Sequence, residues 1–344
     1  MKLGRRALAL LFCALLFAPS ARAAEDGAPF TDVPASHWAY ESVRRAAALG
    51  LVQGMGDGTF GLGGQVTRAQ YAAMLCRLMG WTLTRPETGS FADNADPLAW
   101  YYPYIETVRA RGLLPAAGGT CGPEEPLGRE EMAVLTVRAL DVGLLAGLVQ
   151  DECPFTDTAT NRGYLTLAWR MGVIRGVDRY TFAPAEACTR EQAAAVLLRV
   201  YDRLHAPLTV GAADEAPARA VAAQSLTGTE ALLPVSPRAG LEQVYAAAAQ
   251  AGEGGAVVLR LRPLAQRASA DGGCSAEELT DEAFAALRDS PTSAAYRSAR
   301  YASSYLVCAE GGGIAVVWYE SEEDLACKLT LCRLLGVAGV YLER

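Results

Sequence analysis

The sequence predicts a mainly α-helical fold built from three repeated helical units, followed by a small C-terminal α/β domain. Two observations support this prediction. A unit that opens with Phe-x-Asp occurs at Phe30, Phe91 and Phe155, so the repeat period is about 60 residues. After residue 238 the pattern changes to alternating strand and helix signals. Repetition at this period indicates that the units bury a common core, because one unit alone has too little apolar surface.

Each unit is predicted to be a helix–loop–helix. The first helix ends in a Gly-apolar-apolar step at Gly50, Gly112 and Gly172. Glycine suits a helix C-terminus because it adopts the left-handed conformation easily. The second helix opens at Thr67 and Thr189 in the first and third units, and a glutamine follows three residues later. This spacing is typical of a capping box, and the second unit has a glycine in place of the threonine.

Together these features resemble the S-layer homology (SLH) domain. The resemblance rests on the Phe-x-Asp opening, an early Trp, the Gly-apolar-apolar helix end and the Thr-Arg-x-x helix start, and it covers about residues 28–204. It implies a pseudo-threefold helical assembly of SLH repeats that binds pyruvylated secondary cell-wall polysaccharide without covalent attachment. The expected partner is therefore an anionic wall polymer, and the expected location is the cell wall or cell surface.

In that family an arginine at the start of the second helix, with nearby Asp, Trp and Gly residues, lines the binding grooves. The matching positions are Asp32, Trp38, Gly54 and Arg68 in the first unit, Asp93, Trp100 and Arg129 in the second, and Asp157, Gly176 and Arg190 in the third. The copies differ, because the third has Thr160 in place of Trp and the second has Ala116 in place of Gly. The first copy matches best, so Arg68 is expected to contribute most to wall attachment.

The repeated arginine has two explanations. A cation at the first position of a helix faces the positive end of the helix dipole, which is unfavourable by about 0.3–1 kcal/mol. Free backbone N–H groups at that end favour an anion, so they and the arginine together would grip a carboxylate or phosphate. The alternative is a salt bridge to a neighbouring repeat, for example to Asp32 or Asp157. The tryptophans also have two possible roles, which are packing in the core and stacking on sugars. The opening aspartates are expected to act as caps or bridges.

The C-terminal third has a different organisation. Residues 206–238 are rich in Ala, Pro, Thr and Ser and are predicted to form a linker. The expected elements after it are strands at 256–264, 314–319 and 337–342 and helices at 281–288, 294–307 and 322–335. The final strand, helix and strand suggest a parallel βαβ unit. The predicted domains are a signal peptide at 1–23, repeats at 24–84, 85–148 and 149–205, the linker at 206–238 and a small α/β domain at 239–344.

The end of the chain is similar to the last strands of family-18 glycoside hydrolase barrels. Val316 to Glu320, Lys328-Leu329 and Gly336 to Val340 carry this similarity. A full (β/α)8 barrel needs about 200 residues or more, and the D-x-x-D-x-D-x-E strand end of the family is absent. Glu320 alone is not a two-carboxylate site, so the domain is predicted to be non-catalytic. The alternatives are a wall or spore glycan hydrolase and a self-assembling S-layer subunit.

Composition argues against several other functions. The net charge of −7 does not suit a general nucleic-acid binder. His37 and His205 are the only histidines in the sequence and lie far apart in it, which argues against a zinc site built on histidines and a Ser-His-Asp triad. No metal or cofactor is expected. Cys153 and Cys188 bracket the third unit, and export of the chain would permit a disulfide between them.

The first 23 residues have the pattern of a secretory signal peptide. Basic residues precede an apolar run from Ala7 to Ala18, and Ala21-Arg22-Ala23 is a small-x-small cleavage site. The run is shorter than the roughly 20 residues of a membrane anchor, so no membrane association is expected after cleavage. Cys13 could mark a lipoprotein, but the bulky Phe12 before it argues against this alternative.

The mature protein is therefore expected to begin at Ala24, because signal peptidase cleaves after a small-x-small triplet. The mass of the intact exported protein checks this expectation. An exported chain that keeps Met1, or one that carries a lipid on Cys13, would contradict it.

Overall fold

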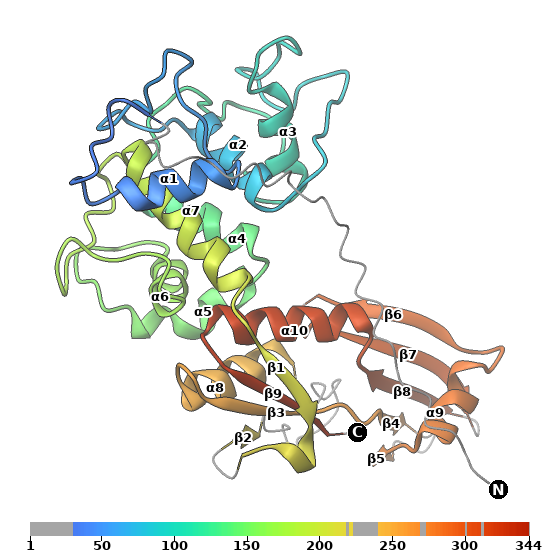
Figure 1. Cartoon of the computed structure of the whole chain (residues 1–344). Coiled ribbons are helices and arrows are strands. Elements are labelled where there is room, and N and C mark those ends of the chain that lie inside the picture. The colour runs from blue at the N-terminus through green and yellow to red at the C-terminus, as the bar shows by residue number, and fades with distance from the viewer. Residues whose placement is uncertain are drawn as a thin grey trace, which may run out of the picture.

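The computed structural model describes residues 30–217, 220–222, 240–268, 273–299, 301–310 and 313–343. The predicted signal peptide and residues 223–239 of the predicted linker lie outside this part. A helical region is followed along the chain by a region with two β-sheets, and Figure 1 shows the helical region above the sheets. The described chain therefore has mixed α and β content, which corrects the prediction of a mainly α fold. The reason is that the C-terminal third holds more strands than the sequence pattern indicated.

The predicted pair of helices is present in each unit. The pairs are α1 (Tyr40–Ala48) with α2 (Arg68–Leu78), α3 (Tyr102–Ala110) with α4 (Arg129–Ala139), and α6 (Arg162–Arg170) with α7 (Arg190–Leu204). Thr67 and Thr189 form the predicted capping boxes, whereas Gly128 provides no side-chain cap. A short segment that was not predicted connects the second and third units. It consists of a 3-10 turn (Gly143–Leu145), α5 (Ala146–Val149) and a second 3-10 turn (Gln150–Glu152).

Gly50, Gly112 and Gly172 end the first helices with φ angles of +72°, +77° and +71°. These values lie in the left-handed region, where a side chain with a Cβ is strained. The glycines therefore let the chain leave each first helix and enter the loop that leads to the second.

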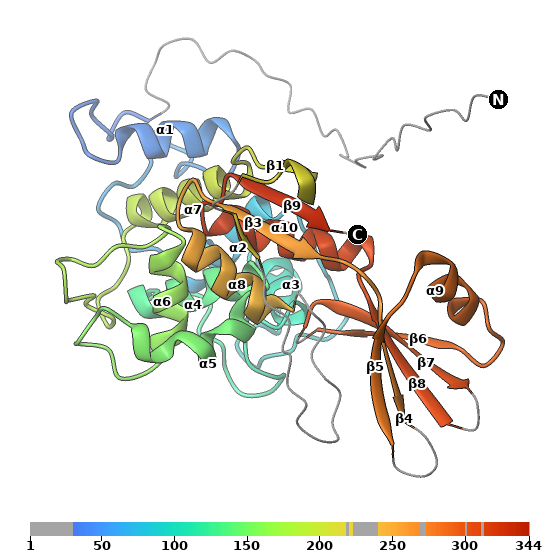
Figure 2. The same cartoon turned by 90° about the horizontal axis from the view of Figure 1, so that it is seen from below.

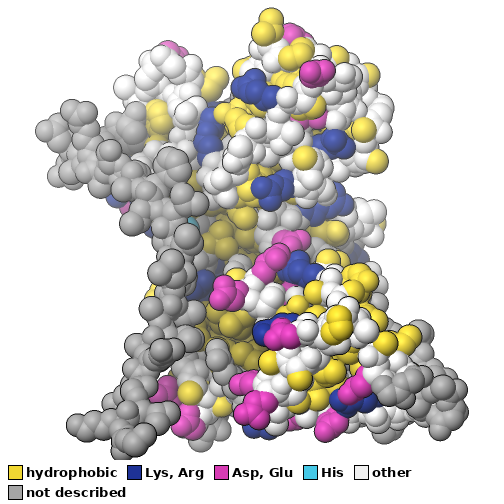
Figure 3. Space-filling model, turned by 90° about the vertical axis from the view of Figure 1, so that its right-hand side faces the viewer, with side chains coloured by type: hydrophobic (Ala, Val, Ile, Leu, Met, Phe, Trp, Pro, Cys, Tyr) yellow, Lys and Arg dark blue, Asp and Glu magenta, His cyan; other side chains and the backbone are white. Residues whose placement is uncertain are grey.

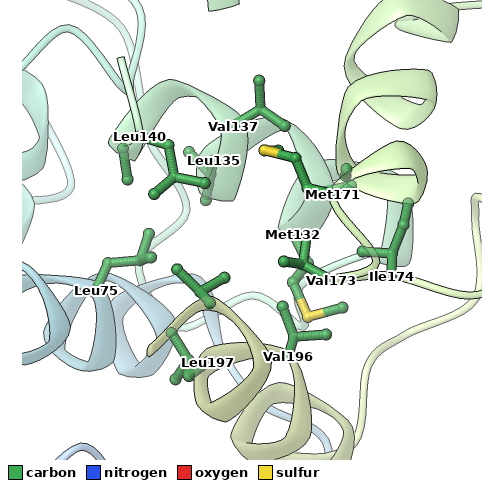
Figure 4. Packing of buried hydrophobic residues seen from close by; sticks show 14 of the residues in the cluster. Leu75, Met132, Leu135, Val137, Leu140, Met171, Val173, Ile174, Val196 and Leu197 are labelled. Atoms are coloured by element: carbon green, nitrogen blue, oxygen red, sulfur yellow. The ribbon is translucent and has the colours of Figure 1, made fainter. Parts of the chain in front are cut away.

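The helices pack between units in a closed cycle. The first helix of each later unit lies against the second helix of the unit before it, as α3 does on α2 and α6 on α4. The cycle closes because α1 of the first unit packs on α7 of the third. Figure 4 shows Leu75 of α2, Leu135 of α4 and Leu197 of α7 directed toward one another. All three are buried in one core, so the second helices supply the centre of the helical region.

Two sheets make up the C-terminal region. The parallel sheet has the order β1-β9-β3-β2, with β1 at Thr209–Ala212, β9 at Gly339–Glu343, β3 at Ala256–Arg260 and β2 at Val221–Ala222. The antiparallel sheet has the order β5-β4-β8-β7-β6, with β5 at Cys274–Glu278, β4 at Leu264–Ala268, β8 at Gly313–Tyr319, β7 at Ser303–Glu310 and β6 at Ala294–Ser298. Helices α8 (Leu241–Ala251), α9 (Asp281–Arg288) and α10 (Glu322–Leu334) complete the region. Figure 2 shows the antiparallel sheet and α9 projecting away from the rest of the chain.

Several sequence predictions for this region are correct. Helices α9 and α10 and strands β8 and β9 lie within a few residues of their predicted positions. The predicted strand at 256–264 is shorter, because β3 ends at Arg260 and β4 begins at Leu264.

Three predictions were wrong. Residues 294–307 form the hairpin strands β6 and β7 rather than a helix. From Ser304 to Cys308 of β7, buried residues alternate with the less buried Tyr305 and Val307. This is a period of two that the alanine-rich start of the segment concealed. Strand β8 belongs to the antiparallel sheet and β9 to the parallel one, so β8, α10 and β9 do not form a βαβ unit. The predicted linker contains β1 and β2, and β1 extends the parallel sheet by pairing with β9.

The helical and parallel-sheet regions share a hydrophobic core. Val200 of α7, Tyr245 of α8 and Leu331 of α10 belong to the same buried cluster, and α10 packs on both α7 and α8. Two polar contacts support this packing, since Arg203 pairs with Glu253 at 3.0 Å and the Arg170 guanidinium lies over the Tyr245 ring. In Figure 1, α10 lies between the repeats and the parallel sheet. The C-terminal region is therefore docked on the third repeat.

The disulfide that the sequence allowed is not formed, because Cys153 and Cys188 are free thiols. Cys188 lies in the segment that meets the second unit, where its N–H donates to the Leu127 carbonyl, and Cys153 lies near Thr158. In the described part of the chain, no single helix is long and apolar enough to cross a membrane. Only α4 and the segment Gly143–Glu152 pass that test as a pair, across a 118° bend.

Candidate functional site

The three repeated arginines each reach from the start of a second helix into the loop of the next unit. Arg129 donates from Nε to the Phe182 carbonyl at 2.9 Å and from Nη2 to the Arg175 carbonyl at 3.0 Å. Arg190 closes the cycle, because it donates to the Phe60 and Gln53 carbonyls of the first unit, both at 2.8 Å.

Arg68 makes the corresponding contacts in the second unit, with the Cys121 carbonyl and with the Gly122 carbonyl at 2.6 Å. Each unit therefore holds the next one through a cation. A contact with a neighbouring repeat was one of the two explanations that the sequence offered for the arginines. The arginines do reach the neighbouring repeat, although they bind backbone carbonyls of its loop.

The opening aspartates hold the same loops from the other side. Asp32 accepts hydrogen bonds from the N–H groups of residues 60, 61 and 62 at 2.6–2.8 Å. Asp93 accepts from residues 121 and 122, and Asp157 accepts from residues 182 and 183. Burial acts to raise the pKa of each carboxyl, but the backbone N–H donors outweigh it and hold the pKa below its ordinary value. The aspartates are thus loop caps, as the sequence favoured.

Carboxylate and guanidinium act on the same peptide groups. In the peptide group that joins residues 60 and 61, the Phe60 carbonyl accepts from Arg190 and the Gly61 N–H donates to Asp32. The Phe182 carbonyl and the Ala183 N–H stand in the same way between Arg129 and Asp157. Hydrogen bonds to charged groups contribute about 1.5–3 kcal/mol each, and bonds in series polarise one another. The network of Asp, loop peptide and Arg therefore joins the three units.

The first-turn N–H groups of the second helices are already bound. The N–H of Arg68 donates to the Glu125 carbonyl, that of Arg129 to the Glu186 carbonyl, and that of Arg190 to the Gly64 carbonyl. Loops of neighbouring units run across these helix ends and bind the first N–H of each. The expectation that free N–H groups at these ends would receive an anion is therefore wrong.

The three arginines differ in their surroundings. Arg129 and Arg190 are 9% and 6% exposed, and burial lowers the pKa of Arg190. Arg68 instead forms an ion pair with Glu131 and a longer one with Glu125. Hydrogen bonding to Glu131 is the main cause that raises the pKa of Arg68. The structure thus places a neutralising carboxylate on the arginine that the sequence ranked first.

A groove of about 230 Å³ brings together predicted site residues from all three units. Its walls include Trp38 of the first unit, Arg129 of the second and Gly176 of the third. The sequence had grouped these residues by repeat, but the closed packing of the helices groups them across repeats. Met132, Ile174 and Val196 also line the groove, and they lie close together in Figure 4.

The tryptophans are not core residues. Trp38 is 60% exposed and Trp100 is 53% exposed. Trp38 belongs to the groove, whereas Trp100 lies against Tyr101 and Tyr104. In the third unit, Thr160 donates to Glu130 instead. An aromatic face is therefore available to a ligand at the first two positions and is absent at the third.

The glycines of the loops have a packing role. A Cβ on Gly54 would lie 2.5 Å from the Phe30 ring and 2.6 Å from the Thr59 carbonyl oxygen. At Gly176 it would lie 2.4 Å from the Asp178 oxygen. Contacts this short would force the turn open, so both loops need glycine whether or not a ligand approaches them.

Sequence reasoning missed two cations of the groove, Arg175 and Arg199. Arg175 follows the Gly-apolar-apolar step, where the other units have Gln53 and Pro115. This difference between the units is the signal in the sequence from which Arg175 could have been predicted. None of the residues lining the groove is acidic, although the whole chain carries a net charge of −7.

The C-terminal region holds a buried ionic cluster. Lys328 is fully buried and pairs with Glu320, whose side chain is 8% exposed. Ser303 donates to Glu320 at 2.8 Å and accepts from Lys328 at 3.0 Å. Burial raises the pKa of Glu320 and lowers that of Lys328, and the attraction between the two opposes both shifts. Because a buried ion pair is strongly destabilised when one partner is lost, this cluster fixes α10 against β7 and β8.

Replacing Asp32 with Asn should destabilise the protein and weaken its sensitivity to acid. A carboxylate with a lowered pKa stabilises the fold above its unfolded pKa of about 3.9, and this contribution is lost as the pH falls through the folded pKa. The melting temperature of Asp32→Asn should therefore be lower at pH 7 and fall less steeply below about pH 4 than that of the wild type. Asp214→Asn, at an exposed position outside the repeats, is the matched control. Identical pH profiles for Asp32→Asn and the wild type would contradict this role.

Comparison with known proteins identifies the repeats. The family model of the S-layer homology domain matches residues 29–72 and 154–194, in the first and third units. The S-layer protein sap of Bacillus anthracis is 34% identical over 113 residues, which are 33% of this chain and 14% of that protein. A cellulosome-anchoring protein of Acetivibrio thermocellus is 30% identical over 164 residues, 46% of this chain and 35% of that protein. The chain thus spans about a seventh of the length of the S-layer relative.

Among solved structures, the spore cortex-lytic enzyme SleL of Bacillus cereus matches 37% of this chain and 31% of its own, at 14% identity and a TM-score of 0.30. That likeness is too low to carry an argument. The repeat pattern, the helix pairs and the family match together lead to one conclusion: this is a secreted, cell-surface-associated protein that carries S-layer homology domains.

Proposed function

We propose that the chain attaches non-covalently to anionic, pyruvylated secondary cell-wall polysaccharide through its SLH repeats. The observation that carries this proposal is the groove lined by Trp38 and Arg129 and by the cations Arg175 and Arg199, with no acidic residue in its walls. An exposed indole beside guanidinium groups suits an anionic sugar, because the ring packs on the sugar face and the cations bind its carboxylate or phosphate.

The assembly that we propose for the repeats is pseudo-threefold. Three features support it: the closed cycle of helix packing, the Arg contacts that run from the first unit to the second, third and back to the first, and the bridges between loop segments. The bridges pair Thr67 with Pro126, Gly128 with Ala187, and Gln65 with Thr189. A ring of this kind creates one groove at each junction, and side-chain differences then decide which groove binds.

The groove residues divide into two roles. Trp38 and the exposed Arg175 are free to contact a ligand. Arg129, Asp32, Asp93 and Asp157 hold the loops that shape the grooves through the backbone contacts described above. The Arg68 side chain is committed to Glu131 and to the second unit, so its removal is expected to affect folding together with attachment.

For the C-terminal region we propose a non-catalytic role. Glu320, the one carboxylate that the sequence singled out, is buried and bound by Lys328 and Ser303. A general acid or a nucleophile must reach the substrate, and this side chain is enclosed. Acidic side chains are frequent on the face of this region in Figure 3, which would disfavour close contact with an anionic polymer. A hydrolase and a self-assembling S-layer subunit remain the competing functions, and formation of ordered arrays by the purified protein would support the latter.

Trp38→Ala should weaken binding of the mature chain to purified wall polymer by roughly two- to tenfold, since an aromatic contact contributes about 0.5–1.5 kcal/mol. The melting temperature should be unchanged, because the side chain is largely exposed. Trp169→Ala removes an exposed tryptophan outside the groove and is the control. Titration calorimetry with native and pyruvate-stripped polymer measures both variants. If Trp38→Ala and the wild type bind the polymer with equal affinity, the groove is not the binding site that we propose.

The mature chain should release no reducing sugar from peptidoglycan or chitin fragments, because Glu320 is enclosed in an ion pair. The whole mature chain is the correct sample, since residues 239–344 share their core with the repeats. Measurable release that disappears in Glu320→Gln would establish an enzyme and overturn the non-catalytic role.

A further inference from the structure

An arginine occupies the same position in all three second helices, but the partners of its side chain differ between the units. Arg77, Arg138 and Arg199 occupy this position in α2, α4 and α7. Arg77 donates to the Gln53 side chain at 3.1 Å, and Arg138 donates to the Leu113 carbonyl at 2.7 Å. Arg199 makes a longer bond, 3.2 Å, to the Val173 carbonyl. The hydrogen bonds of Arg77 and Arg199 are thus nearly equal in length, and Arg138 has the shortest of the three.

Aromatic contacts distinguish the arginine of the third unit from the other two. The Arg77 guanidinium lies 5.8 Å from the centre of the Tyr104 ring, and that of Arg138 lies 5.5 Å from the Tyr164 ring. A cation over such a ring gains about 0.5–1 kcal/mol at an exposed site. Tyr104 and Tyr164 occupy the same position in the second and third units. At that position, four residues after Trp38, the first unit has Ser42. Within residues 30–217, Arg199 accordingly has no ring contact of this kind.

The residue opposite this arginine also changes. In the first unit Gln53 accepts the hydrogen bond of Arg77, so the two positions complement each other. In the third unit the position of Gln53 is taken by Arg175, a second cation. Burial, and then repulsion from Arg175, lowers the pKa of Arg199. Across residues 30–217 neither side chain forms an ion pair, so their charges are uncompensated by protein.

A like-charged pair of this kind in a groove is stabilised by an anion. Arg175 is exposed and Arg199 half-buried, and both line the groove beside Trp38. Two guanidinium groups present paired donors that match a carboxylate or a phosphate. The chain therefore tolerates repulsion at this junction, whereas in the first unit the position of Arg175 holds the neutral Gln53, which accepts a hydrogen bond from Arg77.

We propose that Arg175 and Arg199 form the anion-binding subsite of this groove, and that the junction of the first and third repeats is the principal ligand site. The proposal rests on the proposed function and deepens it. The ligand is a glycan whose carboxylate or phosphate group binds the two arginines while an adjoining sugar face packs on Trp38. The junction of the first and second repeats contributes less, because Glu131 pairs with Arg68 and Gln53 accepts from Arg77. At the junction of the second and third repeats, Arg138 is bound by the Leu113 carbonyl and lies over the Tyr164 ring.

The test uses the full mature chain with the variants Arg175→Gln, Arg199→Gln and the double variant. Arg138→Gln removes the equivalent arginine of the second unit and is the matched control. Affinity for purified wall polymer is measured by calorimetry at low and high salt, beside the melting temperature of each variant. Three polymer samples serve as probes: native, stripped of pyruvate, and stripped of phosphate.

Each single variant should lose roughly tenfold in affinity, because a charged hydrogen bond contributes about 1.5–3 kcal/mol. The double variant should also lose most of the salt dependence. The melting temperature of Arg175→Gln should not fall, since this change installs the residue type of the first repeat and relieves repulsion. If the wild type and the double variant bind one of the stripped polymers with equal affinity, the group removed from that polymer is the anion that the two arginines bind.

The outcomes separate the two proposals. If the wild type binds no wall polymer, the proposed function fails. If the wild type binds and Trp38→Ala weakens binding, but the arginine variants bind as the wild type or lose no more than Arg138→Gln, the anion subsite alone is overturned. A loss of affinity in Arg175→Gln that accompanies a lower melting temperature would assign this residue a structural role and would also overturn it.

Discussion

The structure of the repeats depends on the contact between each second-helix arginine and the loop of the next unit. An arginine at the first position of a helix opposes the dipole by about 0.3–1 kcal/mol. Two hydrogen bonds from a charged donor outweigh this penalty several times over. The carbonyls that receive them are held from behind by Asp32, Asp93 and Asp157. Loss of one arginine would leave loop carbonyls unpaired and open the ring of units at one junction.

The recurrent residues hold the loops that line the groove. The loop that Arg129 and Asp157 hold in place is also the loop that presents Arg175 and Gly176 to the groove. The repeated Asp and Arg residues make similar backbone contacts with the loops of all three units. In the proposed subsite, a position that varies between the units, Gln53 in the first and Arg175 in the third, stands beside the recurrent Arg199.

The docked C-terminal region adds a second constraint. Because α10 packs on α7 and their residues share one core, the parallel sheet is attached rigidly to the third repeat. The Lys328–Glu320 pair extends this rigidity to the antiparallel sheet, since it joins α10 to the end of β8. Any surface that the C-terminal region presents therefore keeps a fixed direction relative to the groove lined by Trp38 and Arg129. A flexible linker, which the composition of residues 206–238 predicted, would not have provided this.

The sequence by itself determined the local structure of the repeats. The period of the units, the capping boxes at Thr67 and Thr189 and the helix ends at Gly50 and its equivalents all depend on residues within a few positions of one another, and each is present. Only the tertiary structure decided how the predicted site residues combine. Trp38, Arg129 and Gly176 meet because α1 closes on α7, a contact between residues far apart in the chain. The neutralisation of Arg68 by Glu131 and the pairing of β1 with β9 have the same origin. Contacts of this range leave no periodic signal in a single sequence, because their partners are fixed by packing between units rather than by spacing along the chain.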